Sequence, residues 1–331
     1  MKAMILAAGE GTRLLPLTRF RPKPLFPIYN VPLLGLTIDH LKRAGVKDIV
    51  INTHHLDQSI ETYIQDIKPA GVNINLSHEE TLLGTGGAIK KVEAFWNDSP
   101  FIVINGDIIH TINITSAYQN HLARGNLTTL IVHNHPPFNR VEIDQGETIV
   151  GIREQRVKTP LTTTRKLAFT GMHIISPEIL EHIPPHHHLD IINLYLELIA
   201  RGEKIGGYPV EGHYWIDIGT PNDYHRIHRD IYNNSNDLRT AYDCHPTRKT
   251  TDATGIDVSL EGYVSLGENT TIGKKCTIKN SILWDGVTIN DNVTIEGCII
   301  ANGVTVTHSL KDEIVVYAEL PSHCGESILN I

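Results

Sequence analysis

The sequence predicts an α/β protein in which a Rossmann-like, mostly parallel mixed sheet is followed by a short left-handed parallel β-helix. Two observations support this prediction. Strand-like and helix-like stretches alternate over about the first 100 residues, as in sheets built from crossover connections. From residue 264 to residue 299 an aliphatic side chain then recurs about every six residues, which is typical of stacked β-helix turns. The length of 331 residues suggests about two domains.

Each element of the sheet domain has a simple pattern. Segment 3–8 is a continuous apolar run, as expected of a strand buried on both faces. Segment 33–44 has apolar residues at helical spacing and stops at Gly45, which can end a helix. The same reasoning predicts strands at 48–53, 72–77 and 101–105, helices at 57–67, 87–96, 188–202 and 224–233, and a less regular, strand-rich stretch over 127–171.

The C-terminal repeat consists of six consecutive hexads from Val264 to Ile299, with Gly and Asn at their corners. An ordinary antiparallel β domain is the alternative, but it would need hairpin-length alternation, which the segment lacks. Each hexad buries its apolar face only by stacking on its neighbours, so we expect end caps or packing between subunits. The predicted organisation is a catalytic domain over 1–235, a linker over 236–255, and the β-helix with a C-terminal tail over 256–331.

Composition excludes several classes of protein. The net charge of −8 argues against nucleic acid as the main partner, and no apolar run is long enough to span a membrane. The apolar stretch before Gly9 is short for a signal peptide, so we expect a cytoplasmic protein. The four Cys residues form no CxxC pair, which argues against a disulfide framework or a zinc site.

A Gly-rich loop follows the first predicted strand, in segment 6–13 (LAAGEGTR). Gly9 and Gly11 allow backbone N–H groups to approach a nucleotide closely. The loop lacks the third Gly of the dinucleotide-binding fingerprint and the Lys-Ser/Thr of a P-loop. Arg13 and Lys23 add the positive charge that a triphosphate needs, although either could instead be a solvated loop charge.

Together with three later segments, this loop resembles the signature of the sugar-1-phosphate nucleotidylyltransferases. The first part has the form G-x-G-T-R, then P-L-T, then P-K-P, within 9–24. The later segments are 83–88 (LGTGGA), 105–107 (NGD) and 215–221 (WIDIGTP). The resemblance covers 1–232, and it is nearest to mannose-1-phosphate guanylyltransferases and MurNAc-1-phosphate uridylyltransferases.

The resemblance implies a reaction in which a sugar-1-phosphate oxygen attacks the α-phosphorus of an NTP and pyrophosphate leaves. Arg13 would stabilise the β- and γ-phosphates, and Lys23 would bridge the α-phosphate and the sugar phosphate. Asp107 and Asp217 would hold Mg²⁺, although a turn residue and a helix N-cap are the alternatives. The implied nucleotide-binding residues are Ala8, Gly9, Gly11, Thr12, Arg13, Lys23, Glu79, Gly84 and Thr85. The implied sugar-binding residues are Asn105, Glu154 and Gly171.

The sequence constrains the identity of the base and the sugar less than it constrains the reaction. Glu79 lies where the family reads the base, and a carboxylate can accept from the adjacent N1–H and 2-amino donors of guanine. This favours GTP with mannose-1-phosphate. A surface role for Glu79, or base reading by Glu80, is the alternative, and so is UTP or dTTP with another hexose- or amino-sugar-1-phosphate.

The sugar side departs from the family pattern. Many relatives have Glu-Lys-Pro where this chain has Glu154, Gln155 and Arg156, so Arg156 or Lys166 is a candidate replacement for the family lysine. Asn139 stands where many relatives have Gly after an aromatic residue.

Two other classes of protein compete with this prediction. A catalytically silent regulatory relative would bind a nucleotide sugar and act by oligomerising, but it would be expected to lack some of Arg13, Lys23, Asp107 and Asp217, which are all present. A bifunctional acyltransferase would need a longer β-helix. We therefore expect an enzyme whose partners are an NTP and a sugar-1-phosphate, assembled as a homo-oligomer through the β-helix.

Overall fold

The computed structural model describes residues 1–157, 163–233, 238, 241–242, 256–318 and 325–330. The chain forms two compact units, each built from two segments. The first unit comprises Met1–Glu10 and Thr37–Trp215, and the second comprises Gly11–Leu36 and Ile216–Ile331. The predicted linker over 236–255 lies almost wholly outside the described residues, and the predicted domain boundaries stay a prediction.

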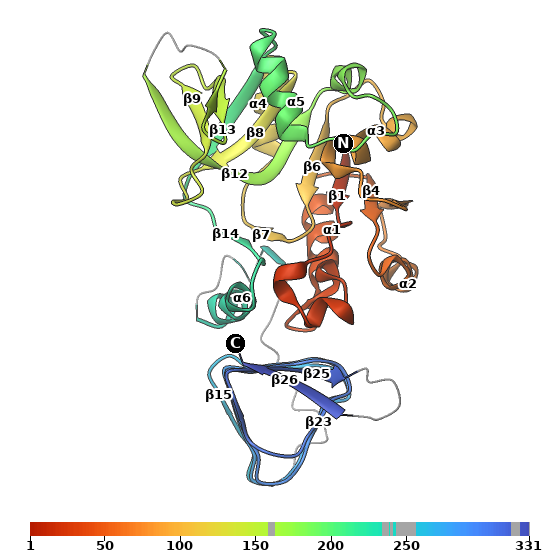
Figure 1. The fold of residues 1–331 in the computed structure, drawn as a ribbon, viewed down its shortest axis with the longest axis vertical. Coiled ribbons are helices and arrows are strands. Elements are labelled where there is room, and N and C mark those ends of the chain that lie inside the picture. Colours follow the sequence, from red (N-terminus) through yellow and green to blue (C-terminus); the bar gives the residue numbers. More distant parts are fainter. Residues whose placement is uncertain (158–162, 234–237, 239–240, 243–255, 319–324, 331) are drawn as a thin grey trace. The chain divides into compact units, whose positions relative to one another are not determined.

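The first unit is built on a mixed sheet, with the strand order β11-β10-β9-β12-β6-β1-β4-β5, and β8 joins β12 to β13 (Figure 1). The four strands β6, β1, β4 and β5 are parallel, and β12 runs antiparallel to β6. This confirms the predicted α/β fold with a mostly parallel mixed sheet. The strands are β1 (Lys2–Leu6), β4 (Asp48–Thr53), β5 (Asn73–His78), β6 (Phe101–Asn105), β7 (Ile108–His110), β8 (Thr128–His133), β9 (Val141–Asp144), β10 (Ile149–Ile152), β11 (Gln155–Arg156), β12 (Thr164–Ile175) and β13 (Ile205–Val210).

The predicted helices are all present, with some ends displaced, and α4 (Ile114–Arg124) was not predicted. The predicted helix over 224–233 begins earlier, at Pro221. The predicted helix over 87–96 instead begins at Gly84 and ends at Lys91, and a separate 3-10 turn covers Glu93–Phe95. The predicted helix over 188–202 starts at Ile191, because the Asp190 side chain accepts from the N–H of Ile192 and caps it. The α-helices are α1 (Leu33–Arg43), α2 (Asp57–Ile67), α3 (Gly84–Lys91), α4 (Ile114–Arg124), α5 (Ile191–Ala200) and α6 (Pro221–Asn233).

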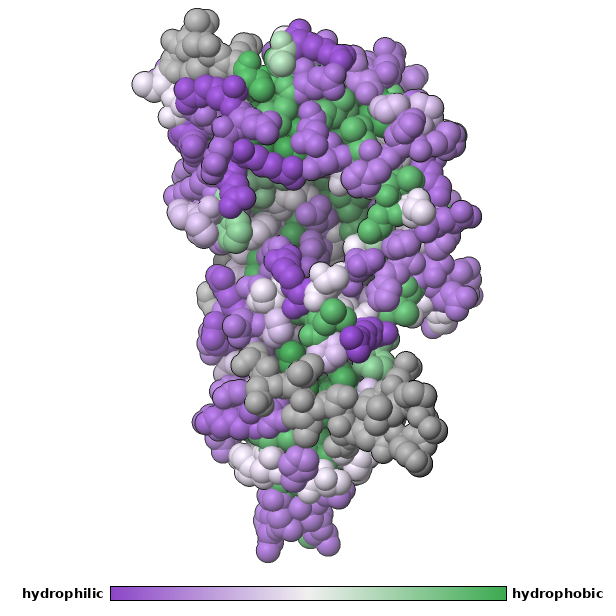
Figure 2. Space-filling view, in the orientation of Figure 1, coloured by the Kyte–Doolittle hydropathy of each residue, from purple (hydrophilic) through white to green (hydrophobic). Residues whose placement is uncertain are grey.

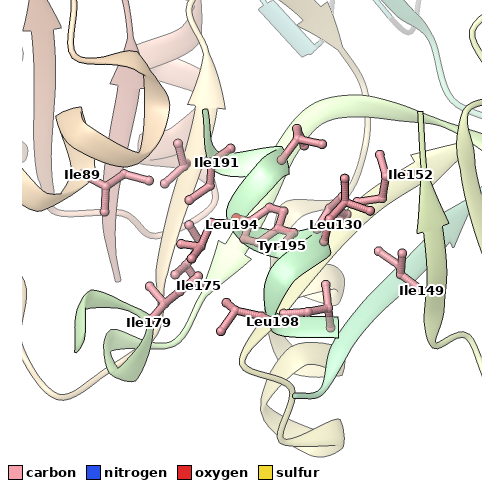
Figure 3. Packing of buried hydrophobic residues seen from close by; sticks show 14 of the residues in the cluster. Ile89, Leu130, Ile149, Ile152, Ile175, Ile179, Ile191, Leu194, Tyr195 and Leu198 are labelled. Carbon is pink, nitrogen blue, oxygen red and sulfur yellow. The ribbon is translucent and has the colours of Figure 1, made fainter. Parts of the chain in front are cut away.

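The core of the first unit forms where α5 packs on the sheet. Figure 3 shows Tyr195 of α5 in the middle of this core, near Leu130 and Leu194. All three side chains are buried. Removal of this apolar area from water is the main stabilising contribution that the core makes.

The second unit contains the predicted β-helix, whose short parallel strands wind into a three-sided coil (Figure 1). Thr271 pairs with Thr288 and Thr288 with Thr305, so one turn of three strands takes 17 residues. Parallel stacking rules out the antiparallel alternative for β15 to β25 and is consistent with a left-handed β-helix. The strands are β15 (Ser259–Glu261), β16 (Ser265–Leu266), β17 (Thr271–Ile272), β18 (Thr277–Lys279), β19 (Ile282–Leu283), β20 (Thr288–Ile289), β21 (Thr294–Glu296), β22 (Ile299–Ile300), β23 (Thr305–Val306), β24 (Leu310–Lys311), β25 (Glu313–Ala318) and an antiparallel β26 (Gly325–Asn330).

The segment Gly11–Leu36 packs within the second unit although it is far from the β-helix in sequence. This segment consists of short elements. Two other elements that contribute to the second unit, β14 (Trp215–Asp217) and α6, lie later in the chain. Its elements are the 3-10 turns Thr12–Leu14, Leu17–Arg19 and Lys23–Leu25, and the strands β2 (Pro27–Ile28) and β3 (Val31–Pro32).

The surface of the protein is mostly hydrophilic on the face that Figure 2 shows. Among the described residues, none of the helices combines the length and the apolar character needed to cross a membrane.

Acid is expected to destabilise both units, because each buries a neutral histidine. His173 is hydrogen-bonded to the Tyr195 hydroxyl, and His228 donates through Nδ1 to the Tyr224 carbonyl. Burial lowers the pKa of each to about 3. The unfolded chain therefore binds more protons below about pH 6.5, so the free energy of unfolding should fall by about 2 kcal/mol per histidine between pH 7.5 and pH 5.

Urea unfolding at the two pH values measures this loss. The exposed His186 lies in a left-handed conformation that Asn tolerates, so His186→Asn is the control and should leave the pH dependence unchanged. A free energy of unfolding that stays constant from pH 7.5 to pH 5 would contradict the prediction.

Candidate active site

The predicted phosphate-binding loop begins where β1 ends. Ala8 is buried, and Gly9 has open space around the position of a Cβ. Gly11 adopts φ +65°, and a Cβ there would lie 2.8 Å from Cγ2 of Thr18. Glycine is therefore needed at this turn. The N–H of Leu14 donates to the Gly11 carbonyl at 2.9 Å, which forms the turn that carries Thr12 and Arg13.

Three of the predicted site residues meet at Asp217, at the end of β14. Lys23 Nζ lies 3.4 Å from Asp217 Oδ1, and Arg13 Nη2 lies 3.8 Å from Asp217 Oδ2. Gly219 lets the guanidinium lie against the backbone, because a Cβ there would be 2.7 Å from Arg13 Nη1. The structure thus brings together two cations and one carboxylate that are separated by about 200 residues of sequence.

The surroundings of these three side chains differ. The side chain of Lys23 is 9% exposed, that of Asp217 is 37% exposed and that of Arg13 is 65% exposed. Thr220 provides the cap of α6, since its Oγ1 accepts from the N–H of Asp223 at 3.2 Å. Asp217 therefore does not need to serve as a helix cap. Two cations around one carboxylate leave a net positive charge that suits a polyphosphate.

The carboxyl ends of β1 and β4 are tied together by Asn52, which the sequence analysis did not single out. Its Oδ1 accepts from the N–H of Ala7 at 2.8 Å, and its Nδ2 donates to Glu79 Oε1 at 2.8 Å. A polar residue at the end of an otherwise apolar buried strand is the signal that could have found it. Asn52 connects the start of the Gly-rich loop to the predicted base-reading residue.

Glu79 is 1% exposed, and both of its carboxylate oxygens have protein partners. Oε1 accepts from Asn52, and Oε2 accepts from the N–H of Leu83 at 2.9 Å. The carboxylate thus closes the turn that precedes α3. Each oxygen keeps a second lone pair, and base reading by Glu79 stays a prediction. Glu80 is exposed.

The LGTGG segment forms the first turn of α3 and packs against the loop before α5. Gly84 has φ +66°, and a Cβ there would lie 2.7 Å from the Leu189 carbonyl oxygen. The N–H of Gly86 donates to that same oxygen at 2.9 Å. Thr85 lies between these two glycines, at a helix N-terminus where backbone N–H groups are available to a ligand.

Two of the three predicted sugar-binding residues lie together. Gly171 has φ +81°, and a Cβ there would meet Asn105 Nδ2 at 2.7 Å. Trp215 donates from Nε1 to the carbonyl of Thr170, the residue before Gly171, at 2.9 Å. The end of β6, the bend in β12 and the start of β14 are thereby joined at one point of the first unit.

A cluster of aromatic rings borders this point, and the sequence analysis missed it. His133 lies 4.9 Å from Trp215 and 5.2 Å from His135 between ring centroids, and His135 stacks on Phe138. Burial, with repulsion from His213 and His135, lowers the pKa of His133 to about 4. The rings form an aromatic wall beside Thr170.

The third predicted sugar-binding residue, Glu154, lies in the exposed turn between β10 and β11 with φ +66°. Arg156, a candidate for the missing family lysine, donates from Nε to Glu142 Oε2 at 3.0 Å. Hydrogen bonds from Arg156 and Thr164 lower the pKa of Glu142. Lys166 is exposed on β12, paired in register with Glu142. The guanidinium of Arg156 is thus held by a carboxylate, whereas the roles of Glu154 and Lys166 stay predictions.

The predicted metal ligands have suitable chemistry. Asp107 follows β6 and Gly106, whose N–H donates to the Leu6 carbonyl at 2.9 Å and so holds the turn against β1. Among the residues that the structure describes, no three His, Cys, Asp or Glu side chains gather as a preformed metal site. Mg²⁺ usually takes only one or two carboxylates together with phosphate oxygens and water. The carboxylates of Asp107 and Asp217 are donors of this kind.

Comparison with known proteins supports the resemblance seen in the sequence. The profile of the family described as "Nucleotidyl transferase" matches residues 2–234. A UTP–glucose-1-phosphate uridylyltransferase of Synechocystis sp. is 32% identical over 70% of this chain, which spans 63% of that protein. An N-acetylmuramate alpha-1-phosphate uridylyltransferase of Neisseria meningitidis serogroup B is 34% identical over 66% of this chain and 94% of that protein. A mannose-1-phosphate guanylyltransferase of Mycobacterium tuberculosis is 26% identical over 86% of this chain and 80% of that protein.

A similar fold occurs in a solved structure. The crystal structure of HddC from Yersinia pseudotuberculosis has a TM-score of 0.58 and 25% sequence identity, covering 68% of this chain and 97% of that one. A second structure of HddC, complexed with GMP-PN, has a TM-score of 0.56.

Proposed function

Because the chain belongs to the nucleotidyl transferase family, we propose that it transfers a nucleotidyl group from an NTP to a sugar-1-phosphate, giving an NDP-sugar and pyrophosphate. The pair that we put forward is GTP with mannose-1-phosphate, giving GDP-mannose. The observation that carries the proposal is the meeting of Arg13 and Lys23 at Asp217, next to a turn that requires Gly11.

The proposed mechanism uses the chain's own charges. Both substrates are anions, so their mutual repulsion must be cancelled before a sugar phosphate oxygen can approach the α-phosphorus. In this proposal Lys23, held by Asp217 in a nearly enclosed position, contacts the α-phosphate and the incoming sugar phosphate. The more exposed Arg13 stabilises the β- and γ-phosphates and the charge that develops on the departing pyrophosphate.

Mg²⁺ is the cofactor that we propose, since members of the family generally use a divalent metal. When bound, the ion would supply positive charge that neutralises the phosphates. Asp107 and Asp217 are the proposed ligands, each a carboxylate at or just after a strand end. No other described residue is needed, because substrate phosphates and water complete such sites.

The relatives differ in the nucleotide base and the sugar that they are named for. Proteins that resemble this chain are named as a UTP–glucose-1-phosphate uridylyltransferase, an N-acetylmuramate alpha-1-phosphate uridylyltransferase and a mannose-1-phosphate guanylyltransferase. Guanine is supported by the proposed pairing of its N1–H and 2-amino donors with Glu79. UTP or dTTP with another hexose- or amino-sugar-1-phosphate is the second candidate, because both oxygens of Glu79 already accept hydrogen bonds from the protein.

A matrix of substrates tests the proposal. Pyrophosphate release is measured with Mg²⁺ for GTP, UTP, dTTP, ATP and CTP, each combined with mannose-, glucose-, GlcNAc- and MurNAc-1-phosphate. Release with GTP and mannose-1-phosphate alone is the expected result. Release with UTP and an amino-sugar phosphate would keep the reaction and overturn the base assignment. If no pair reacts, other sugar-1-phosphates must be tested next, and the alternative of a catalytically silent regulatory relative gains support.

We further propose that the β-helix assembles the chain into a homo-oligomer in the cytoplasm. Stacked repeats leave open ends that need a cap or a partner. Gel filtration with light scattering on the full chain should therefore show more than one subunit, and deletion of residues 256–331 should reduce the mass to that of fewer subunits. A monomer that the deletion leaves monomeric would exclude this role.

A further inference from the structure

The β-helix contacts the segment that carries the two catalytic cations. Arg21 donates from Nη2 to Asp285 Oδ2 at 3.0 Å and to Asn302 Oδ1 at 3.1 Å. Its guanidinium carbon also lies 4.9 Å from the ring centroid of Trp284. Arg21 precedes Lys23 by two residues, with only Pro22 between them. The backbone immediately before Lys23 is therefore anchored to one corner of the β-helix.

The backbone after Lys23 is anchored to the same corner of the β-helix. Phe26 is fully buried, and its ring lies edge-on to Trp284 with 5.0 Å between the centroids. Trp284 donates from Nε1 to the Tyr224 hydroxyl at 3.1 Å, and this hydroxyl donates to the Pro27 carbonyl at 2.6 Å. One tryptophan of the β-helix thus supports the chain on both sides of Lys23.

Little freedom remains for the segment between these anchors. Pro22 and Pro24 flank Lys23 and restrict its backbone, and Trp284 is 1% exposed. Displacement of a catalytic group by about 1 Å can cost 10²-fold in rate. The matched family profile ends at residue 234, before the β-helix begins, so this support lies outside the part of the chain that the family profile describes.

We propose that the Arg21–Asp285–Trp284 contact is a positioning device that holds Lys23 in place for the nucleotide, which makes the β-helix part of the catalytic machinery. The inference rests on the proposed function, because it takes Lys23 to bind the nucleotide phosphates. Arg21, Trp284 and Asp285 act through Lys23 and do not themselves touch the substrate.

The variant Asp285→Asn tests the device and should keep the fold. Asp285 has two tasks, since Oδ1 accepts from the N–H of Glu268 at 3.0 Å while Oδ2 accepts from Arg21. The side-chain oxygen of asparagine can still accept from the N–H of Glu268. Its amide NH₂ then faces Arg21, and two donors cannot form a hydrogen bond. Asp291 provides the matched control, because its Oδ1 accepts from the N–H of Lys274 at 2.7 Å at an equivalent corner.

Two readouts separate this inference from the proposed function. In hydrogen exchange, peptides covering residues 11–28 should exchange faster in Asp285→Asn than in the wild type by about threefold or more, and Asp291→Asn should match the wild type. In turnover with the substrate pair found active, Asp285→Asn should lower kcat/KM for the NTP and for the sugar-1-phosphate by about threefold to tenfold, because Lys23 is proposed to contact both phosphates. Asp291→Asn should leave both values unchanged. The double variant Arg21→Gln with Asp285→Asn should be no worse than Arg21→Gln alone.

Unchanged exchange over residues 11–28 in Asp285→Asn would overturn the inference, whatever the enzyme's substrates are. An equal loss of kcat/KM in Asp285→Asn and in Asp291→Asn would also overturn it, because that pattern indicates a general structural effect. Absence of turnover in the wild type would instead defeat the proposed function, and the exchange result would still decide whether the β-helix holds the segment.

Discussion

Replacing Asp107 by asparagine is expected to abolish most turnover while the protein stays folded. Asparagine has nearly the same size, so the turn after β6 and the Gly106 hydrogen bond to Leu6 should persist. The charge that we propose as a metal ligand is lost. Removal of one preorganised group that stabilises charge costs about 10²–10³ in rate, and removal of a metal ligand can cost more.

The measurement is kcat for the active substrate pair over a series of Mg²⁺ concentrations. The variant should need more Mg²⁺ for half-maximal rate as well as being slower. Asp144→Asn is the control, since Asp144 is also a carboxylate at a strand end, the last residue of β9, where its Oδ1 accepts from the N–H of Thr148 at 2.9 Å. Turnover of Asp107→Asn close to that of the wild type would remove Asp107 from the mechanism.

A second large loss is expected for Lys23→Met. Methionine has a similar length and keeps the apolar contacts of the stem, but it removes the charge that faces Asp217 at 3.4 Å. The α-phosphate and the sugar phosphate then lose the cation that we place between them. We expect kcat/KM to fall by about 10²–10³, with both substrates affected.

Stability must be measured alongside, because Lys23 is nearly enclosed. Asp217 is 37% exposed and keeps Arg13 as a partner, so the loss should stay below the ~3–5 kcal/mol expected for breaking a fully buried pair. Lys279→Met is the control, since Lys279 Nζ lies 3.3 Å from Glu296 in an ion pair within the same unit but on the β-helix. Thermal unfolding then shows whether the lost activity exceeds what unfolding explains. Wild-type kcat/KM in a folded Lys23→Met protein would show that this lysine does not contact the reacting phosphates.

Local periodicity was sufficient to predict most of the elements. The strand over 48–53 and the helix over 57–67 have the predicted bounds, because their apolar spacing is strong and their ends carry clear polar signals. The helix over 87–96 was placed too late. The helix begins at Gly84, where the lack of side chains at Gly84 and Gly86 lets its first turn pack closely against Leu189 in the loop before α5.

The site could be predicted as a set of residue types, and its contacts could not. The meeting of Arg13 and Lys23 at Asp217 depends on folding over about 200 residues, and only the resemblance to a family indicated it. Asn52 was missed because nothing in its local sequence shows that it joins two strand ends. The same limit applies to Trp284, whose partners lie in the segment 11–36 and in α6.

Transfer of the nucleotidyl group to the intact sugar phosphate is the central claim, and the mass of the product tests it most directly. The enzyme is given its active NTP with a sugar-1-phosphate whose phosphate oxygens are labelled with heavy oxygen. We expect an NDP-sugar that carries all of the label, with unlabelled pyrophosphate, because the sugar phosphate oxygen is the attacking atom. Nucleoside monophosphate formed without sugar, or label lost from the NDP-sugar, would contradict it.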